Sequence, residues 1–444
     1  RIAGLAEARR RGAERLAQWH ADLAEPFSPA ALEFSKAGLG EGEIRCGREG
    51  DGAGRGGMLF ALRYCGLAIA AWFGVLLAIC RFGGSGGRVA GTRLVALHGE
   101  VSNRTRHLLD ALKAGEPADG LLVLGLPRRS LKALREDWAP WLGDRGLALW
   151  RPVSLRAFLQ SLPAGWRAVA DAYRLARTCP VLPPARALSA ILARLWLGEA
   201  HARWWSQQGG SVAQVAYGHT GTADTSRLEL AQQAGGATTV HVMHGVSAGR
   251  NFVGLSTVAV WRCGHDADWH ARLGGYGRNE WVPAERPSWR CGENGLLLLT
   301  SFAHPMYLGY RLAGIAEEVA LLRAVAEAAK KAGVEGPWTW LPHPAARLLP
   351  EAERRLLERT ARGLGFVSAP PGKGFVELAL EARWVVSSES TVVVDLMRSG
   401  VLPIMCPSPW GEADAALSAY PGRASDVVSL VGEFGLPPLQ QESR

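Results

Sequence analysis

The sequence of 444 residues predicts an α/β fold with two consecutive units. From residue 90 onward, short apolar runs alternate with amphipathic stretches, which is typical of strand–helix–strand units in a parallel sheet. The pattern stops in a stretch rich in Pro and Gly at 280–295 and then begins again. A chain of this length also exceeds one ordinary core. We therefore expect two tandem Rossmann-like domains, preceded by a hydrophobic helix.

Composition narrows the classes of partner. The formal net charge is +9 and the pI is near 9.4, with an excess of arginine that suits an anionic partner and is equally typical of a GC-rich genome. The arginines are dispersed and no recognition module appears, so we expect no nucleic-acid partner. Seven cysteines are scattered without a C-x-x-C pair, which fits a reducing compartment better than a disulfide framework.

The first 82 residues divide into two segments. Residues 1–57 read as a basic helical and linker region that ends in a glycine-rich stretch. Residues 58–82 predict a hydrophobic helix, because 64–80 carry no charge and approach the roughly 17–25 residues that span a bilayer. Arginines on both sides give no orientation. Two interpretations remain open: a helix in or on a membrane, and a buried helix of a soluble core.

Each half of the remaining chain has its own expected elements. The first domain is expected at 88–285 and the second at 286–444. In the first, the stretch 130–208 reads as rich in helix and tryptophan. Expected strands are 92–100, 120–127, 211–218, 237–245, 256–264, 296–301, 338–341, 383–388 and 401–405; expected helices are 102–115, 225–236, 311–332, 350–363, 374–382 and 390–399.

A cluster of hydroxyl side chains follows the expected strand at 383–388. It consists of Ser387, Ser388, Ser390 and Thr391, at the start of an expected helix. One hydroxyl is enough to cap a helix, whereas a helix N-terminus with several hydroxyls is suited to an anion. In an open α/β sheet this place lies at the carboxyl ends of the strands, where ligands bind. The cluster therefore predicts a phosphate site.

His343 stands between Pro342 and Pro344 at the end of the neighbouring expected strand. The prolines keep the backbone at this point out of a helix and out of the hydrogen-bond ladder of a sheet. The imidazole is therefore expected to face a ligand rather than to pack in the core. An imidazole there can donate to a phosphate or protonate a leaving group. Ser301, in the loop of a second His-Pro pair, could face the same ligand.

The first half supplies candidates for a general base at two strand ends. Asp224 lies in a Gly- and Thr-rich loop that also carries His219, and it could alternatively be the N-cap of the following helix. His244 is followed by Gly245, which would let the backbone approach a ligand closely. Both segments are expected at the same edge of the sheet.

No metal site is expected. The segment at 263–270 contains Cys, His and Asp, but its spacing matches no standard zinc pattern and reads better as a capped helix start. The chain also lacks the P-loop, H-E-x-x-H, G-x-S-x-G and G-x-G-x-x-G motifs. Hydrolase, NTPase and dehydrogenase functions are therefore disfavoured.

The two tandem halves, His343-Pro344 and Ser387-Ser388 together resemble the GT-B glycosyltransferases of bacterial capsule and surface-polysaccharide synthesis. The resemblance is to the sialyltransferase-like and Kdo-transferase-like groups and covers roughly 90–410. Ser387 follows His343 by 44 residues. The acid-acid-Gly base motif of the sialyltransferase-like group is not recognisable. The CDP-glycerol-type polymer transferases show a similar layout.

This resemblance implies a metal-independent transfer of a sugar from a nucleotide-sugar, CMP-linked, to a surface polysaccharide or lipid-linked glycan. The donor would be a substrate, with no further cofactor. By resemblance, His343 would contact the donor phosphate and assist its departure, and the hydroxyl cluster would bind phosphate. The expected location is the cytoplasm, at the inner face of the bacterial inner membrane. Alternatives are a CDP-alditol phosphate transferase and a non-catalytic GT-B-like scaffold.

Overall fold

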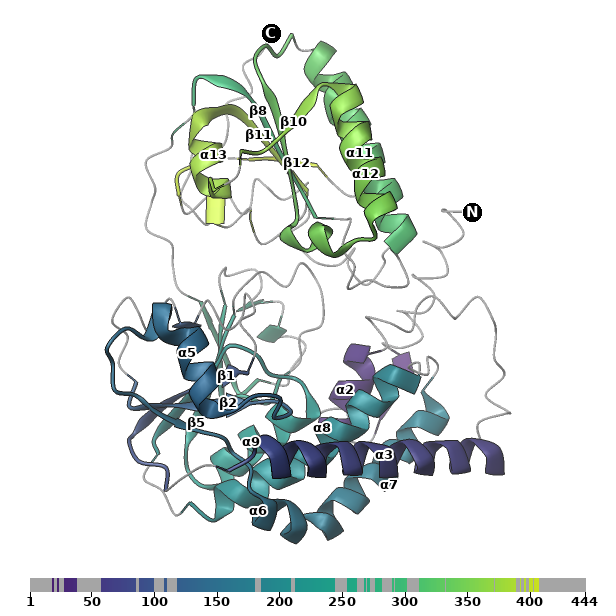
Figure 1. The fold of residues 1–444 in the computed structure, drawn as a ribbon, viewed down its shortest axis with the longest axis vertical. Helices are drawn as coiled ribbons and strands as arrows, with labels where there is room; N and C mark the ends of the chain where they lie inside the picture. The colour runs from purple at the N-terminus through teal and green to yellow at the C-terminus, as the bar shows by residue number, and fades with distance from the viewer. Residues whose placement is uncertain are drawn as a thin grey trace.

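The structure, a computed structural model, contains two parallel β-sheets, one in each half of the chain (Figure 1). The predicted α/β class, with two tandem Rossmann-like sheets and an apolar N-terminal helix, is confirmed. The residues described are 18–19, 22–23, 28–37, 57–84, 88–99, 108–109, 118–179, 185–208, 212–243, 254–261, 267–268, 270–271, 276–281, 290, 292–301, 311–331, 333–370, 372–388, 392, 395–396, 399–401 and 403–406.

The first sheet has seven described strands, all parallel, in the order β3-β2-β1-β4-β5-β6-β7. The five strands predicted for this half are confirmed. The two edge strands, β3 and β7, were not predicted, because β3 is only three residues long and β7 enters the stretch at 280–295 that reads as a linker. The strands are β1 Arg93–His98, β2 Gly120–Leu124, β3 Ala148–Trp150, β4 Gln214–Tyr217, β5 Thr238–Val242, β6 Val258–Trp261 and β7 Arg278–Trp281.

Helices cover both faces of the first sheet. Val95 and Leu97 of β1 belong to a core with Trp138 of α5, whereas Leu94 belongs to a core with Trp204 of α8. Alternate residues of one strand thus bury opposite faces, which explains why the strands read as continuous apolar runs. The predicted helix at 102–115 lies outside the described residues, apart from 108–109. The helices of this half are α2 Pro29–Ala37, α5 Leu131–Leu142, α6 Leu155–Gln160, α7 Leu162–Thr178, α8 Ala185–Ser206 and α9 Ala223–Ala234.

The second sheet has five described strands, also parallel, in the order β10-β9-β8-β11-β12. α11 and α12 cover one face and α13 the other (Figure 1). The four predicted strands are confirmed, and the short edge strand β10 was not predicted. The elements are β8 Asn294–Thr300, α11 Arg311–Lys331, β9 Trp338–Pro342, α12 Glu351–Leu364, β10 Phe366–Ser368, α13 Phe375–Glu381, β11 Ala382–Ser388 and β12 Ile404–Cys406.

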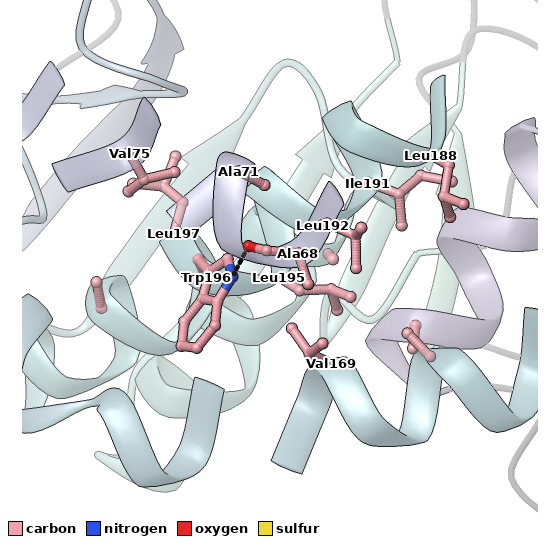
Figure 2. Close-up of a cluster of buried hydrophobic side chains, with 14 of the residues drawn as sticks. Ala68, Ala71, Val75, Val169, Leu188, Ile191, Leu192, Leu195, Trp196 and Leu197 are labelled. Atoms are coloured by element: carbon pink, nitrogen blue, oxygen red, sulfur yellow. Dashed lines mark hydrogen bonds between the residues drawn. The ribbon is translucent and has the colours of Figure 1, made fainter. Parts of the chain in front are cut away.

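The predicted hydrophobic helix is confirmed as α3, Met58–Phe82. One face belongs to the core that α7 and α8 form in the first half of the chain. Figure 2 shows Ala68, Ala71 and Val75 of α3 against α8, where Trp196 Nε1 donates to Ala68 O at 3.3 Å. Among the described residues, α3 alone is long and apolar enough to cross a membrane by length and composition.

Candidate active site

Both sheets have a topological switch point, where the connections from two adjacent strands run in opposite directions. In the first sheet β1 pairs with β2 and with β4. In the second sheet β8 pairs with β9 and with β11. Ligands of open parallel sheets bind outside the carboxyl ends of the strands at such points. The residues that follow β1, β4, β8 and β11 are therefore the candidates for ligand binding.

Three residues predicted from the sequence lie at adjacent strand ends of the second sheet. The β8–β9 register ends with Thr300 opposite Pro342, which places Ser301 beside His343. The β8–β11 register places Ser388 level with Thr300. Because neighbouring strands lie about 4.8 Å apart, the three positions form one short row along the edge. This row includes both strands of the switch point.

His343 occupies the first position after β9. Pro342 is the last residue of the strand, and Pro344 begins a 3-10 helix, Pro344–Leu348, in which Ala346 N donates to His343 O at 2.8 Å. As predicted, His343 lies outside the hydrogen-bond ladder of the sheet. Burial lowers the pKa of the half-buried imidazole from its ordinary value. His343 is therefore neutral at pH 7, with one N–H donor and one acceptor nitrogen.

The predicted hydroxyl cluster is only partly described. Ser387 is fully buried at the end of β11, and Ser301 is half-buried. Ser388 is placed as the last residue of β11. Ser390 and Thr391 lie outside the described residues, so the phosphate role of the whole cluster stays a prediction.

A buried polar network, which the sequence did not indicate, supports the β8 end of this row. Glu318 of α11 is fully buried and accepts a hydrogen bond from Thr300 Oγ1. Trp340 Nε1 of β9 donates to Thr300 Oγ1 at 3.0 Å and to Glu318 Oε1 at 3.3 Å. The network thus joins β8, β9 and α11 one residue before Ser301. A buried carboxylate needs such partners, so the network fixes the strand ends in register.

We expect Glu318→Ala to lower the free energy of unfolding by about 1–3 kcal/mol, because it removes the buried acceptor of the Thr300 hydroxyl and one of the two acceptors of Trp340 Nε1. The measurement is urea denaturation followed by circular dichroism. Glu327→Ala is the matched control on the same helix, since its side chain is 68% exposed and its ion pair with Lys331 is solvated. Equal losses for the two variants would contradict the role of the network.

In the first sheet, two histidines meet at the switch point. His98 is the last residue of β1, and His219 follows β4; their ring centroids lie 4.7 Å apart at an interplanar angle of 67°. Both are half-buried. The sequence placed His219 in a candidate loop but did not indicate His98, because the contact depends on β1 and β4 being neighbours although they are far apart in the chain.

Asp224 lies in the first turn of α9 and is 1% exposed. Thr222 is the N-cap and forms a capping box with Thr225, so the alternative interpretation of Asp224 as the N-cap is wrong. Asp224 Oδ1 has no hydrogen-bond partner among the described residues. A buried oxygen without a partner is uncommon, and a catalytic role is one reason for which such a group is kept.

His201 of α8 is the close neighbour of Asp224. Burial lowers the pKa of His201 to about 4. The carboxylate and the backbone of Asp224 act to raise this pKa, whereas the charge of His98 lowers it further. His201 is therefore neutral at pH 7. α8 and α9 approach closely at Gly198, where a Cβ would lie 2.8 Å from Ala223 O. This contact brings His201 to the N-terminus of α9, and His201 is also near enough to His98 for the charge of His98 to lower its pKa.

A second buried carboxylate on α9 differs from Asp224 in having partners. Glu229 is fully buried and accepts hydrogen bonds from Thr220 and from Ser256. Between Thr220 and the helix, Gly221 adopts a φ of +77°, in the left-handed region that favours glycine. This network holds the loop after β4, and with it His219, in place.

Two other predicted regions contribute less to the described site. His244 and Gly245 lie outside the described residues. In the segment at 263–270, buried His270 stacks on Trp261 with ring centroids 4.0 Å apart, and burial lowers its pKa to about 3. No group of three or more His, Cys, Asp or Glu side chains in the described part of the chain could hold a metal ion.

No protein-family model and no curated protein sequence matches the chain. Among solved structures, the crystal structure of MurG from Acinetobacter baumannii is similar to it, with 10% sequence identity and a TM-score of 0.37. The similarity covers 79% of this chain and 96% of that chain. A similarity at this TM-score gives no information about the function of the chain.

Proposed function

We propose that the chain is a glycosyltransferase that takes a sugar from a nucleotide-sugar, CMP-linked, and transfers it to a glycan or lipid-linked acceptor. The observation that carries the proposal is the row of Ser301, His343 and Ser388 at three adjacent strand ends. Hydroxyls and a neutral imidazole at a switch point supply several hydrogen-bond donors without a fixed charge. Such a set can bind a phosphate and release it after transfer.

The neutral state of His343 determines how the proposed donor site, at the edge of the second sheet, acts on the donor phosphate. A neutral imidazole donates through its N–H to a phosphate oxygen and strengthens that bond as negative charge grows on the leaving CMP. Serine hydroxyls rotate to donate to the same oxygens. Pro344 sets the exit of the backbone and so the direction of the ring. These groups stabilise the leaving phosphate and require no metal ion.

The acceptor side is assigned to the edge where His98 and His219 meet. One of these half-buried imidazoles takes the proton of the acceptor hydroxyl. Asp224, expected from the sequence to be the base itself, is too deeply buried to be the first group that an acceptor meets. We assign it the role of stabilising the charged imidazole from behind. His244 stays a second candidate base, with Gly245 beside it.

The proposed setting is the inner face of the bacterial inner membrane, where lipid-linked glycans are built and where a net charge of +9 favours an anionic surface.

The domain limits of 88–285 and 286–444 belong to the same proposal, with the acceptor bound by the first domain and the donor by the second.

Thermal stabilisation by CMP, CDP, UDP and GDP tests the donor class. We expect CMP to raise Tm, by mass action on the folded state, and UDP and GDP to leave it unchanged. A larger shift with CDP than with CMP would favour the alditol phosphate transferase, whose donor carries a second phosphate and whose leaving group is CMP. No response to any of the four would contradict the enzyme and favour the scaffold.

A further inference from the structure

α3 has two different apolar faces. The inner face packs on the protein through buried Tyr64, Ala68, Ala71, Val75 and Ile79. The outer face is exposed and also apolar; its large side chains are Leu62, Ile69, Phe73 and Leu77, which are 64%, 46%, 51% and 67% exposed. On the same helix, a Cβ added at Gly66 or Gly74 would meet nothing within 4 Å.

The outer face is long and free of charge. Between Arg63 and Arg81 its exposed residues are uncharged, and a helix of 25 residues is about 37 Å long. Neighbouring helices add exposed Leu155 and Leu159 of α6 and Trp166 of α7, whose ring meets Trp196 beside α3. Single exposed apolar side chains are common on soluble monomers, whereas a row of them along a whole helix marks an interaction site.

α3 is attached to the protein along its whole length. Phe60 stacks on Tyr173 of α7 near the start, with ring centroids 5.8 Å apart, and Trp72 stacks on Phe158 of α6 near the middle at 6.2 Å. At the end, Arg151 donates to Phe82 O. If α3 crossed a bilayer in this arrangement, α7 would enter the hydrocarbon with its exposed Arg174–Asp171 ion pair. That cost opposes crossing.

The charge around the face identifies its partner. In the described helices α3, α6 and α7, six arginines are exposed against one carboxylate, Asp171. The arginines are Arg63, Arg81, Arg156, Arg167, Arg174 and Arg177. An apolar helix face with basic side chains around it is the pattern of helices that lie in the headgroup region of anionic membranes. A second copy of the chain would bring the same positive charges together.

We propose that α3 lies flat on an anionic lipid bilayer, with its outer face at the boundary between headgroups and acyl chains. The inference refines the membrane contact of the proposed function and is independent of its chemistry. It differs from a spanning anchor, because the inner face of α3 remains part of the protein core. Bound in this way, the first sheet is held at the surface where a lipid-linked acceptor is presented.

Co-sedimentation with vesicles tests the proposal. The full chain is expected to pellet with vesicles of phosphatidylcholine and phosphatidylglycerol, and to pellet less with phosphatidylcholine alone or at high salt. Phe73→Glu and Leu77→Glu are each expected to weaken binding by about tenfold or more. Leu356→Glu, a 45% exposed leucine of α12, is the matched control and should bind like the parent. Equal binding by all four proteins would overturn the proposal.

The depth of nitroxide labels in the bilayer distinguishes a helix that lies flat on the membrane from one that spans it. Nitroxide labels are placed at Cys65, at position 73 and at Cys80, of which Cys65 and Cys80 are exposed free cysteines, in a chain without other reactive thiols. A flat helix gives the same shallow depth at the three sites, whereas greatest depth at position 73 would show a spanning helix and overturn the proposal. The proposal would also be overturned if the protein did not bind vesicles and instead formed dimers in solution that Phe73→Glu dissociates.

CMP-induced stabilisation of Phe73→Glu, measured without vesicles, separates this inference from the proposed chemistry. If the variant responds to CMP like the parent but no longer binds vesicles, both proposals stand. A parent chain that responds to CMP and does not bind vesicles overturns only the membrane inference. A parent chain that binds vesicles and ignores all nucleotides overturns only the donor assignment.

Discussion

His343→Ala is expected to lower the rate of CMP release from CMP-sialic acid and CMP-Kdo by about 10²- to 10⁴-fold, the range of a group that stabilises or protonates a leaving group. The variant should fold, because His343 is half-buried and lies after the end of β9, not within a core. His343→Gln, which keeps an N–H donor, should retain more activity than alanine if the imidazole acts as a neutral donor. Ser368→Ala, at the end of edge strand β10, is the control and should stay active.

The pKa of His343 gives a second readout that does not need a substrate. Because the folded protein lowers this pKa, protonation opposes folding. Below about pH 6.5 the unfolded chain binds the proton more readily, so the His343 contribution to stability falls as pH falls. We therefore expect the parent to lose free energy of unfolding relative to His343→Gln as the pH is lowered from 7 toward 5. Parallel curves would mean that the imidazole is freely solvated.

Asp224→Asn is expected to lower transfer by about 10²-fold or more while leaving stability unchanged or increased. The amide keeps the shape of the carboxyl group, and the buried Oδ1 has no hydrogen bond to lose among the described residues. Loss of activity without loss of stability is the result expected for a carboxylate kept for function. The measurements are CMP-sugar turnover and urea denaturation.

Glu229→Gln is the matched control on the same helix. Both oxygens of this buried carboxylate accept hydrogen bonds, from Thr220 and Ser256. Replacing one oxygen by an amino group sets a donor against a hydroxyl, so we expect a loss of about 1–3 kcal/mol of unfolding free energy. If Asp224→Asn loses stability to the same extent as Glu229→Gln, Asp224 is a structural group and its proposed role beside the catalytic imidazole fails.

The sequence predicted the elements with strong patterns. The apolar run at 120–124 is strand β2, because helices cover both faces of the parallel sheet and every residue of the strand is buried. The strand expected at 237–245 is β5, Thr238–Val242, in which buried residues alternate with half-buried ones. The short edge strands β3, β7 and β10 have no such run. Their pairing comes from a neighbour already in place, and therefore they could not be found from the chain alone.

The donor side of the candidate site was more predictable than the acceptor side. His343 and Ser388 each follow a recognisable strand, and parallel strands end at one edge, so their proximity follows from the fold class. His98 and His219 come together only because β4 pairs with β1 although two strands and four described helices separate them in the chain. Likewise, Glu318 reads as one more charge on a helix until the packing of α11 shows it buried against Thr300.

Calorimetric titration of CMP and of cytidine into the parent and into His343→Ala tests the central claim, that the edge of the second sheet binds the donor phosphate. The parent is expected to bind CMP at least about tenfold more tightly than cytidine, since charge-assisted hydrogen bonds to the phosphate are worth about 1.5–3 kcal/mol. His343→Ala is expected to lose most of this difference while its affinity for cytidine is unchanged. Equal affinity of the parent for CMP and cytidine, or an unchanged difference in His343→Ala, would contradict it.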